Sequence, residues 1–426
     1  MMKYIYLFLC LFLGVSSIYG QKGTAGQNDN PVANQSEAPK KMKKKSVMKE
    51  VKNYYKASNF SKVDEIILNT FKTYVDAPSD PDLLGYEMNT QYQLYLNENK
   101  KIFLNQKGDT TKFFNHIYKT YVFGLKCDSV SSIPNTEGKT YKKFSSDINN
   151  RLFSLRNNLK SGAMFHLKKN NFKDALSFFQ IYIRTMKNPI VYKNLQVRAD
   201  TDSLKLYYMA LHSAYGAGQY HEVLYYHPIA ALYSEKTEVV TEMAAQSAIH
   251  LGDTVLFLKL ANKGFESYPD NEYFKANLIK YYHDHNDLSH TLRVLNRCIQ
   301  TDSIAPKYWK LKGNAYYEID SLDSAVDAYQ HVVEIDKDDV DALSKLANIF
   351  LRKASLFYES ANLKIGAPYY ERNRKILSAY YQEAMSYYER IRALKPDDTS
   401  LWKDGLRETY YKLNKGKELE KLEHFK

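Results

Sequence analysis

Apolar residues recur at intervals of three and four over most of the chain, which is the spacing of one face of an α-helix. Clear examples are Leu204, Tyr207, Tyr208 and Leu211, and then Ala325, Ala328, Tyr329, Val332 and Val333. Polar residues occupy most of the positions between them. The pattern therefore predicts an all-α fold made of amphipathic helices that each bury one face.

Residues that tolerate a tight turn recur every 34 residues between these helices, at Gly218, Gly252, Asn286 and Asp320. Small or apolar residues recur at the same interval where two antiparallel helices would cross, at Ala230, Gly264, Cys298 and Val332. The sequence thus predicts contiguous copies of a helix, a tight turn and a second helix. Four copies follow one another without a slip, at 204–237, 238–271, 272–305 and 306–339.

The copy at 306–339 has aromatic and small residues at Trp309, Gly313, Tyr316, Ala325 and Tyr329. It resembles a tetratricopeptide repeat, whose pattern has Trp, Gly, Tyr, Ala and Phe at these places. It departs from that pattern at Lys312, where Leu is expected, and at Lys337, where Pro is expected. Pro269 and Pro396 occupy that last place in other copies. The resemblance implies a right-handed α-solenoid of antiparallel helical hairpins with a long concave face.

Less regular segments flank the four copies. Residues 46–143 indicate divergent N-terminal helical hairpins, and residues 144–203 indicate one tetratricopeptide-like hairpin with a linker. Residues 340–398 predict a repeat with a lengthened hairpin, because the counterpart of Ala325 lies 59 residues downstream instead of 34. Residues 399–426 predict a C-terminal capping helical segment, since a terminal repeat has no neighbour to bury against.

The first 20 residues have the pattern of a secretory signal. Lys3 is followed by an unbroken apolar run at residues 5–15 and then by small residues up to Gly20. This run is shorter than the ~20 residues that span a bilayer. We therefore expect residues 1–20 to be a cleaved signal peptide and the protein to be exported to the periplasm or cell envelope. An uncleaved anchor is the alternative.

Residues 21–45 predict a disordered basic linker, because they are rich in Asn, Gln, Gly and Ala and end in a lysine cluster. The cluster consists of Lys40, Lys41, Lys43, Lys44 and Lys45. It is expected to be a solvated tether or to make a peripheral membrane contact. The formal net charge of +12 owes much to this segment. Since the body shows no nucleic-acid-binding motif, no nucleic-acid partner is expected.

No pattern in the sequence predicts catalysis, a cofactor or a metal site. Gly138-Lys139-Thr140 lacks both the first glycine of a phosphate-binding loop and a preceding strand. His283, His285 and His290 straddle an expected hairpin corner and do not have a zinc-binding spacing. Cys127 and Cys298 would lie several hairpins apart, so we expect two unpaired thiols. The protein is therefore not expected to be an enzyme.

The candidate binding site is the concave face, which the resemblance places along the first helix of each hairpin. Its expected residues are Lys205, Tyr208, His212, Tyr215, Tyr273, Lys280, His283, Lys307, Lys310, Asn314 and Tyr317. Such side chains favour extended peptides of acidic or polar character. We therefore expect a protein–protein interaction scaffold of the cell envelope that binds segments of a partner protein in its concave groove.

A second interpretation is an outer-membrane-associated platform that captures nutrient glycans, as some exported proteins built on such repeats do. Those proteins carry a lipid-modified cysteine at the end of the signal. Cys10 instead lies inside the apolar run, between Leu9 and Leu11. The sequence therefore favours the scaffold.

Overall fold

The structure is a computed structural model that describes residues 41–186, 201–361 and 363–424. Within these ranges it contains 18 α-helices and no strand, so the all-α prediction is confirmed. The predicted signal peptide, residues 21–40 of the predicted linker with Lys40, and residues 187–200 lie outside the described residues.

The helices follow one another as antiparallel pairs. The N-terminal helices are α1 (Lys44–Lys56), α2 (Phe60–Thr73), α3 (Pro81–Phe103), α4 (Thr110–Ser131), α5 (Ser145–Lys168) and α6 (Phe172–Thr185). The middle helices are α8 (Thr201–Gly216), α9 (Tyr220–Ala230), α10 (Thr237–His250), α11 (Thr254–Ser267), α12 (Glu272–Asp284), α13 (Leu288–Thr301), α14 (Pro306–Glu318) and α15 (Leu322–Ile335). The last are α16 (Val340–Ser360), α17 (Tyr370–Leu394), α18 (Lys403–Lys412) and α19 (Gly416–Glu423). Short 3₁₀ helices at Ala77–Ser79, Ser234–Lys236 and Thr399–Leu401 lie between them.

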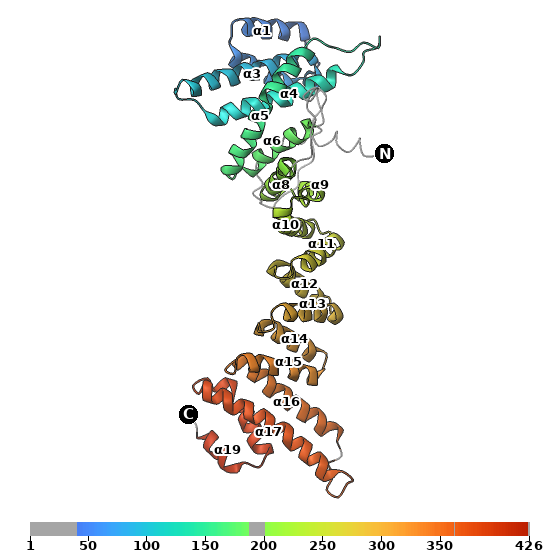
Figure 1. The fold of residues 1–426 in the computed structure, drawn as a ribbon, viewed down its shortest axis with the longest axis vertical. Coiled ribbons are helices and arrows are strands. Elements are labelled where there is room, and N and C mark those ends of the chain that lie inside the picture. Colours follow the sequence, from blue (N-terminus) through green and yellow to red (C-terminus); the bar gives the residue numbers. More distant parts are fainter. Residues whose placement is uncertain (1–40, 187–200, 362, 425–426) are drawn as a thin grey trace, which may run out of the picture.

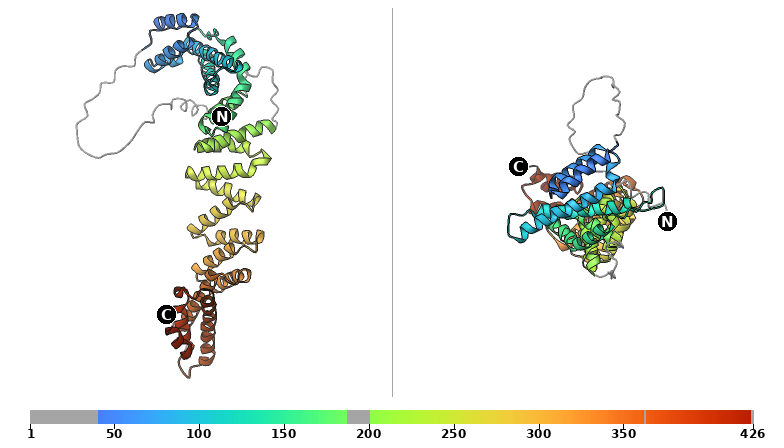
Figure 2. Two further views of the ribbon diagram at one scale, coloured as in Figure 1. Left: turned by 90° about the vertical axis from the view of Figure 1, so that its left-hand side faces the viewer. Right: turned by 90° about the horizontal axis from the view of Figure 1, so that it is seen from above.

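The hairpins stack along one axis into an elongated molecule (Figure 1). Helices α1 to α6 form a head at one end, α8 to α15 form a narrow column, and α16 to α19 form the other end. Each hairpin packs on the next one along the chain, as α9 does on α10, α11 on α12 and α13 on α14. The side view in Figure 2 shows this stacking, which confirms the predicted solenoid of helical hairpins.

The hairpin corners adopt the left-handed backbone conformation. Gly218, Gly252, Asn286 and Asp320 have φ angles of 67°, 73°, 55° and 57°, which confirms the turns predicted from the 34-residue spacing. Glycine, Asn and Asp enter this region with little strain. Ser58, Asn170 and Asn414 take the same conformation between α1 and α2, α5 and α6, and α18 and α19. The corner geometry therefore extends to hairpins outside the regular copies.

The positions expected at helix crossings are buried. Ala230, Cys298 and Val332 have no exposed surface. At Gly264 an added Cβ would lie 2.4 Å from the ring of Phe274 on the next hairpin. Small residues are needed here because adjacent helices of the array approach closely.

The hairpin of α16 and α17 is longer than its neighbours, as predicted. Helix α16 has 21 residues and α17 has 25, whereas α14 has 13 and α15 has 14. The arms are thus eight and eleven residues longer, or about 12 and 16 Å at the helical rise of 1.5 Å per residue. The turn at their tip contains Gly366 and Tyr369, both with positive φ.

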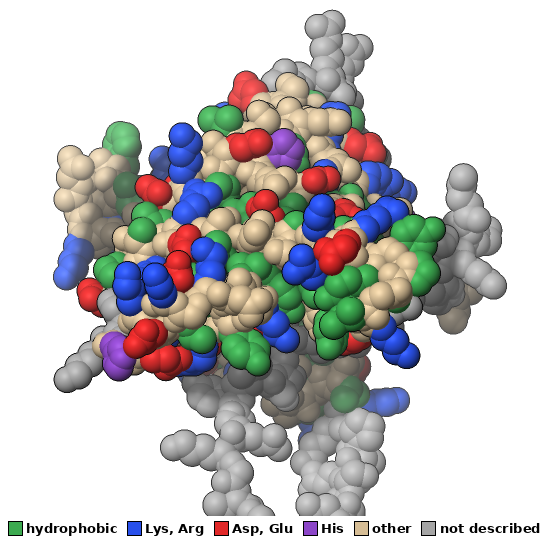
Figure 3. Space-filling view, turned by 90° about the horizontal axis from the view of Figure 1, so that it is seen from below, with side chains coloured by type: hydrophobic (Ala, Val, Ile, Leu, Met, Phe, Trp, Pro, Cys, Tyr) green, Lys and Arg blue, Asp and Glu red, His purple; other side chains and the backbone are tan. Residues whose placement is uncertain are grey.

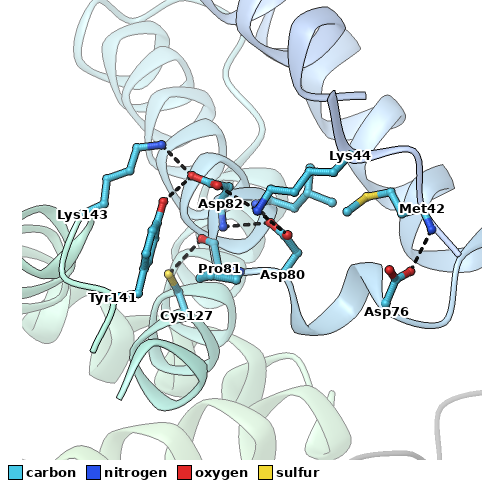
Figure 4. A network of polar contacts seen from close by, with 10 residues as sticks. Met42, Lys44, Asp76, Asp80, Pro81, Asp82, Cys127, Tyr141 and Lys143 are labelled. Atoms are coloured by element: carbon cyan, nitrogen blue, oxygen red, sulfur yellow. Dashed lines mark hydrogen bonds and ion pairs between the residues drawn. The ribbon is translucent and has the colours of Figure 1, made fainter. Parts of the chain in front are cut away.

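The predicted boundary of the disordered linker is wrong at its last two residues, because Lys44 and Lys45 belong to α1. Lys44 forms ion pairs with Asp80 at 2.7 Å and Asp82 at 3.0 Å, at the start of α3. Asp82 also accepts hydrogen bonds from Tyr141 and Lys143, each at 2.6 Å (Figure 4). These contacts attach the start of α1 to the start of α3.

Both described cysteines are free and buried, which confirms the prediction of two unpaired thiols. Burial raises the pKa of the Cys127 thiol and of the Cys298 thiol to about 11. Neither thiol is therefore a thiolate at neutral pH, which makes both unreactive in the folded protein.

Candidate functional site

A pocket of ≈430 Å³ opens between α12, α13 and α14 on the face formed by the first helices of the hairpins. Four of the residues predicted for the groove line it: Lys280, His283, Lys307 and Asn314. Its other lining residues include the aliphatic side chains of Ala276, Ile279, Leu295 and Leu311. The pocket therefore has an apolar floor and a polar rim, as binding pockets commonly do.

Side chains of neighbouring hairpins neutralise the charges on the rim. Glu272 accepts hydrogen bonds from Lys307 at 2.8 Å, Lys275 at 3.0 Å and Tyr308 at 3.0 Å. The hydrogen bond from Lys307 is the main reason that the pKa of Glu272 falls to about 2, against the opposing effect of partial burial. The carboxylate of Glu272 thus remains ionised at any ordinary pH, and its hydrogen-bond partners are side chains of this protein.

The other rim cations are paired as well. Lys280 lies 2.6 Å from Asp284 on the same helix. His283 lies 3.2 Å from Glu318 on α14. With these partners in place, the lysines contribute little net positive charge to the pocket. The reason to expect an acidic ligand here is therefore weak.

Lys310, Asn314 and Tyr317 connect hairpins to one another. Lys310 forms ion pairs with Asp339 at 2.7 Å and Asp341 at 3.3 Å, at the start of α16. The amide oxygen of Asn314 accepts a hydrogen bond from the Tyr329 hydroxyl at 2.5 Å. The ring of Tyr317 lies 5.4 Å from the guanidinium of Arg352. Of these three predicted groove residues, only Asn314 lines the pocket.

The remaining predicted groove residues lie outside the pocket. On α8, Tyr208 and His212 are ring neighbours at 6.1 Å, Tyr215 donates a hydrogen bond to Gln246, and Lys205 is exposed. Tyr273, at the start of α12, has a buried hydroxyl for which the described residues offer no hydrogen-bond partner. Of the predicted groove residues, four thus lie on α8 and four line the pocket at α12 to α14, whereas Tyr273, Lys310 and Tyr317 do neither.

Sequence reasoning missed the apolar floor and Glu272. A signal for the charged partners was present, since Glu272 and Lys307 are 35 residues apart and so are His283 and Glu318. Opposite charges at one repeat length would place both side chains on adjacent hairpins. No comparable signal marked Leu311, which is 41% exposed. It directly precedes Lys312, the position at which the repeat pattern has a leucine.

The described residues contain no group of three or more His, Cys, Asp and Glu side chains that could hold a metal ion. The three histidines near the α12–α13 corner have separate partners, which are Glu318 for His283, the Tyr281 carbonyl for His285 and Asp287 for His290. Gly138-Lys139-Thr140 lies in the loop between α4 and α5. Among the described residues as a whole, no helix combines the length and the hydropathy needed to cross a membrane.

Residues 313–353 match a family model described as the tetratricopeptide repeat. These residues run from the second half of α14 through α15 into α16. The chain therefore contains a tetratricopeptide repeat over these residues. Hairpins with the same 34-residue spacing and the same left-handed corners precede the matched segment.

Solved structures of repeat proteins resemble parts of this chain. The C-terminal part of a repeat protein from Cytophaga hutchinsonii is 16% identical with a TM-score of 0.37, over 61% of this chain and 91% of that one. A repeat protein from Bacteroides fragilis is 16% identical with a TM-score of 0.30, over 60% and 98%. The MamA protein is 17% identical with a TM-score of 0.32, over 44% and 88%. No curated protein matches the sequence.

Proposed function

We propose that this protein is a non-enzymatic scaffold that binds an extended segment of a partner protein. One apolar side chain of that segment occupies the pocket between α12, α13 and α14. The observation that carries the proposal is the aliphatic floor of this pocket, open to solvent on the first-helix face of a repeat array. Repeat arrays present such extended faces to their ligands, and anchor side chains in apolar pockets supply much of the affinity.

The paired charges on the pocket rim indicate which side chains of the bound segment would flank its apolar anchor. Because Lys280, His283 and Lys307 already have acidic partners, uncharged polar groups suit the rim better than carboxylates do. This replaces the acidic preference expected from the sequence. Glycan capture has less support, because Tyr308 is the only aromatic residue lining this pocket apart from His283, while sugars stack on aromatic faces.

The test is capture of partners from envelope extract with the intact chain and two variants. Leu311→Glu places a charge in the pocket, and Ile304→Glu places the same charge at a 75% exposed residue outside it. We expect the Leu311 variant to retain at least about tenfold less partner than the unmodified chain. The Ile304 variant should retain the full amount. Equal capture by all three proteins would exclude the pocket as the site, and a retained glycan without protein would favour the glycan platform.

We also propose that the protein acts after export, in the periplasm or cell envelope. The support is the pattern of residues 1–20, with a basic start, an apolar run and small residues before Gln21. N-terminal sequencing of the protein from the envelope fraction should begin at Gln21. A chain that keeps Met1 in that fraction would indicate an anchor instead.

A further inference from the structure

Two turns of the head lie next to each other and form one edge. The turn between α3 and α4 and the turn between α5 and α6 are linked by aromatic contacts. Phe114 near the start of α4 lies 5.0 Å from Phe165 near the end of α5, and Lys169 lies 4.3 Å from the Phe165 ring. Both turns lie on the left side of the head in Figure 1. We call residues 96–112 and 160–174 together the head edge.

The head edge carries a strong excess of positive charge. It contains eight lysines against three acids, a net charge of +5. The lysines are Lys100, Lys101, Lys107, Lys112, Lys160, Lys168, Lys169 and Lys173. All except Lys160 are exposed. By contrast, the end formed by α16 to α19 shows both signs of charge interspersed (Figure 3).

Two of the three acids of the head edge, Glu98 and Asp109, are already engaged by the chain itself. Glu98 pairs with Lys101 at 2.6 Å and accepts a hydrogen bond from the Asp109 amide at 3.0 Å. Asp109 caps α4 by accepting from the amides of Thr111 and Lys112. Asp174 lies 3.6 Å from His166. Within the described residues, Lys101 is the only one of the eight lysines in an ion pair, which leaves the others available to an external anion.

Apolar side chains project from the same edge. Phe103, the last residue of α3, is 83% exposed, and its neighbours Ile102 and Leu104 are 39% and 49% exposed. The turn that presents them is tightly closed, since Gln106 donates a backbone hydrogen bond to Lys101 at 2.9 Å. Gly108 packs so closely on Ile102 that an added Cβ would lie 2.6 Å from that side chain. The apolar tip is therefore preformed.

An open pocket of ≈420 Å³ lies on the part of the head edge formed by α5 and the start of α4. It is lined by Phe114, Met164 and Phe165 and flanked by Lys160, Ser161 and Lys168. Apolar walls beneath two lysines suit a molecule with an anionic head and an apolar chain. The head edge thus offers the same combination twice, once as a projecting tip and once as a shallow pocket.

We propose that the head edge docks on an anionic lipid surface. Lysines around a projecting phenylalanine are the combination by which proteins attach to such surfaces, because the charges attract the headgroups while the apolar tip enters the interface. The edge has no arginine, whose fork favours fixed bidentate contacts with single phosphates. A diffuse layer of charge fits point-like ammonium groups better.

This contact differs from the membrane contact expected at Lys40–Lys45. Lys44 is paired at the start of α3, whereas Phe103 is at the end of that 23-residue helix. The two places are therefore separated by about 34 Å at 1.5 Å per residue. The head edge is also several hairpins away from the pocket at α12 to α14, so lipid docking and partner binding can be measured separately.

The test is sedimentation with vesicles of phosphatidylcholine alone or with about one third phosphatidylglycerol. All proteins lack residues 1–20, because that apolar run would enter lipid by itself. The test variant is Lys100→Gln, Lys107→Gln and Lys112→Gln in one chain. The control, with the same change in charge, is Lys49→Gln, Lys52→Gln and Lys56→Gln on α1, which are exposed and lie outside both the head edge and the Lys40–Lys45 cluster. A further variant, Phe103→Ser, removes the apolar tip without changing the charge.

We expect the anionic vesicles to bind the unmodified protein at least about tenfold more tightly than neutral vesicles. The head-edge triple variant and Phe103→Ser should each lose most of that binding, while the control stays within about twofold of the unmodified protein. Thermal unfolding should be unchanged in all variants, because every changed side chain is exposed.

Three results would overturn the proposal. The first is equal binding to neutral and anionic vesicles. The second is loss of binding in the control variant with none in the head-edge variant. The third is tighter binding to a single-stranded oligonucleotide than to vesicles, together with no effect of Phe103→Ser, which would indicate a general polyanion site.

Discussion

Single residues set the spacing of the helices in this array. Each corner residue reverses the chain in a left-handed conformation, and glycine, Asn and Asp occupy the regular corners. Fourteen residues or fewer then form each helix of the column apart from α8. Small residues at the crossings, such as Gly264 and Ala230, let successive helices approach. The register of the array thus depends on a few positions, such as Gly264, where a larger side chain would overlap the next hairpin.

Gly264→Ala should destabilise the protein by about 1–3 kcal/mol, because the new methyl group would overlap the buried ring of Phe274. Urea unfolding followed by circular dichroism measures the change. Gly416→Ala is the control, since an added Cβ there meets open space at the start of α19. Because alanine favours a helix more than glycine does, helix propensity alone would not destabilise either variant. A gain in stability for Gly264→Ala, or no change, would contradict the close contact with Phe274.

At the scale of elements, polar networks hold helices that have little apolar surface to share. Helix α1 buries only Met48 and Val51. Its start is held instead by the contacts of Lys44 with Asp80 and Asp82. Although burial raises the pKa of Asp82, the hydrogen bonds from Lys143, Tyr141 and Lys44 outweigh it and bring that pKa to about 2. The attachment of α1 therefore depends on an ionised carboxylate.

Asp82→Asn should reduce the acid sensitivity of the fold. Because the pKa of Asp82 is lower in the folded state than its usual value of 3.8, its stabilisation is present above about pH 4 and is lost as the pH falls through about 2. Between neutral pH and about pH 2 the unmodified protein should lose roughly 2 kcal/mol more stability than the variant.

Urea unfolding at both pH values gives this difference. Asp323→Asn is the control, because Asp323 pairs with Lys353 but its side chain is 89% exposed, and an exposed pair contributes about 0.5 kcal/mol or less. If the unmodified protein and Asp82→Asn lose the same stability on acidification, the ionised carboxylate of Asp82 does not stabilise the fold.

At the scale of the whole molecule, side chains one hairpin apart join the array. Lys307 reaches back to Glu272, His283 reaches forward to Glu318, and Lys310 reaches forward to Asp339 and Asp341. In a solenoid, stability comes from each hairpin and from its interface with the next. Groups that were expected to face a ligand thus hold neighbouring hairpins together.

Lys310→Glu should destabilise the protein by about 1–3 kcal/mol, because it places a carboxylate against two others, one of which is only 13% exposed. Lys280→Glu is the matched control, since Lys280 is 74% exposed and pairs with Asp284 on its own helix. The urea midpoint should fall clearly for the first variant and little for the second. Equal shifts would contradict a role of Lys310 between hairpins.

Much of the fold could be predicted because its signals are local. The interval of three and four residues indicates a helix, and a turn residue such as Asn286 marks where that helix ends. The long hairpin could be predicted from the displaced counterpart of Ala325. The site could be predicted only in part. Lys280, His283, Lys307 and Asn314 line the pocket. The 35-residue intervals from Glu272 to Lys307 and from His283 to Glu318 were a signal for acidic partners, but an interval alone does not show that two side chains meet.

The sequence by itself determined the helices, their corners and their 34-residue spacing, because each depends on residues within one hairpin. Only the tertiary structure decided which charges remain available. Ion pairs such as Glu272 with Lys307 form across hairpins, where small rotations of one helix against the next change a distance by several ångströms. The same holds for the head edge, where the rings of Phe114 on α4 and Phe165 on α5 lie 5.0 Å apart although the residues are far apart in the chain. Their proximity follows from how α4 and α5 pack, and no local pattern records it.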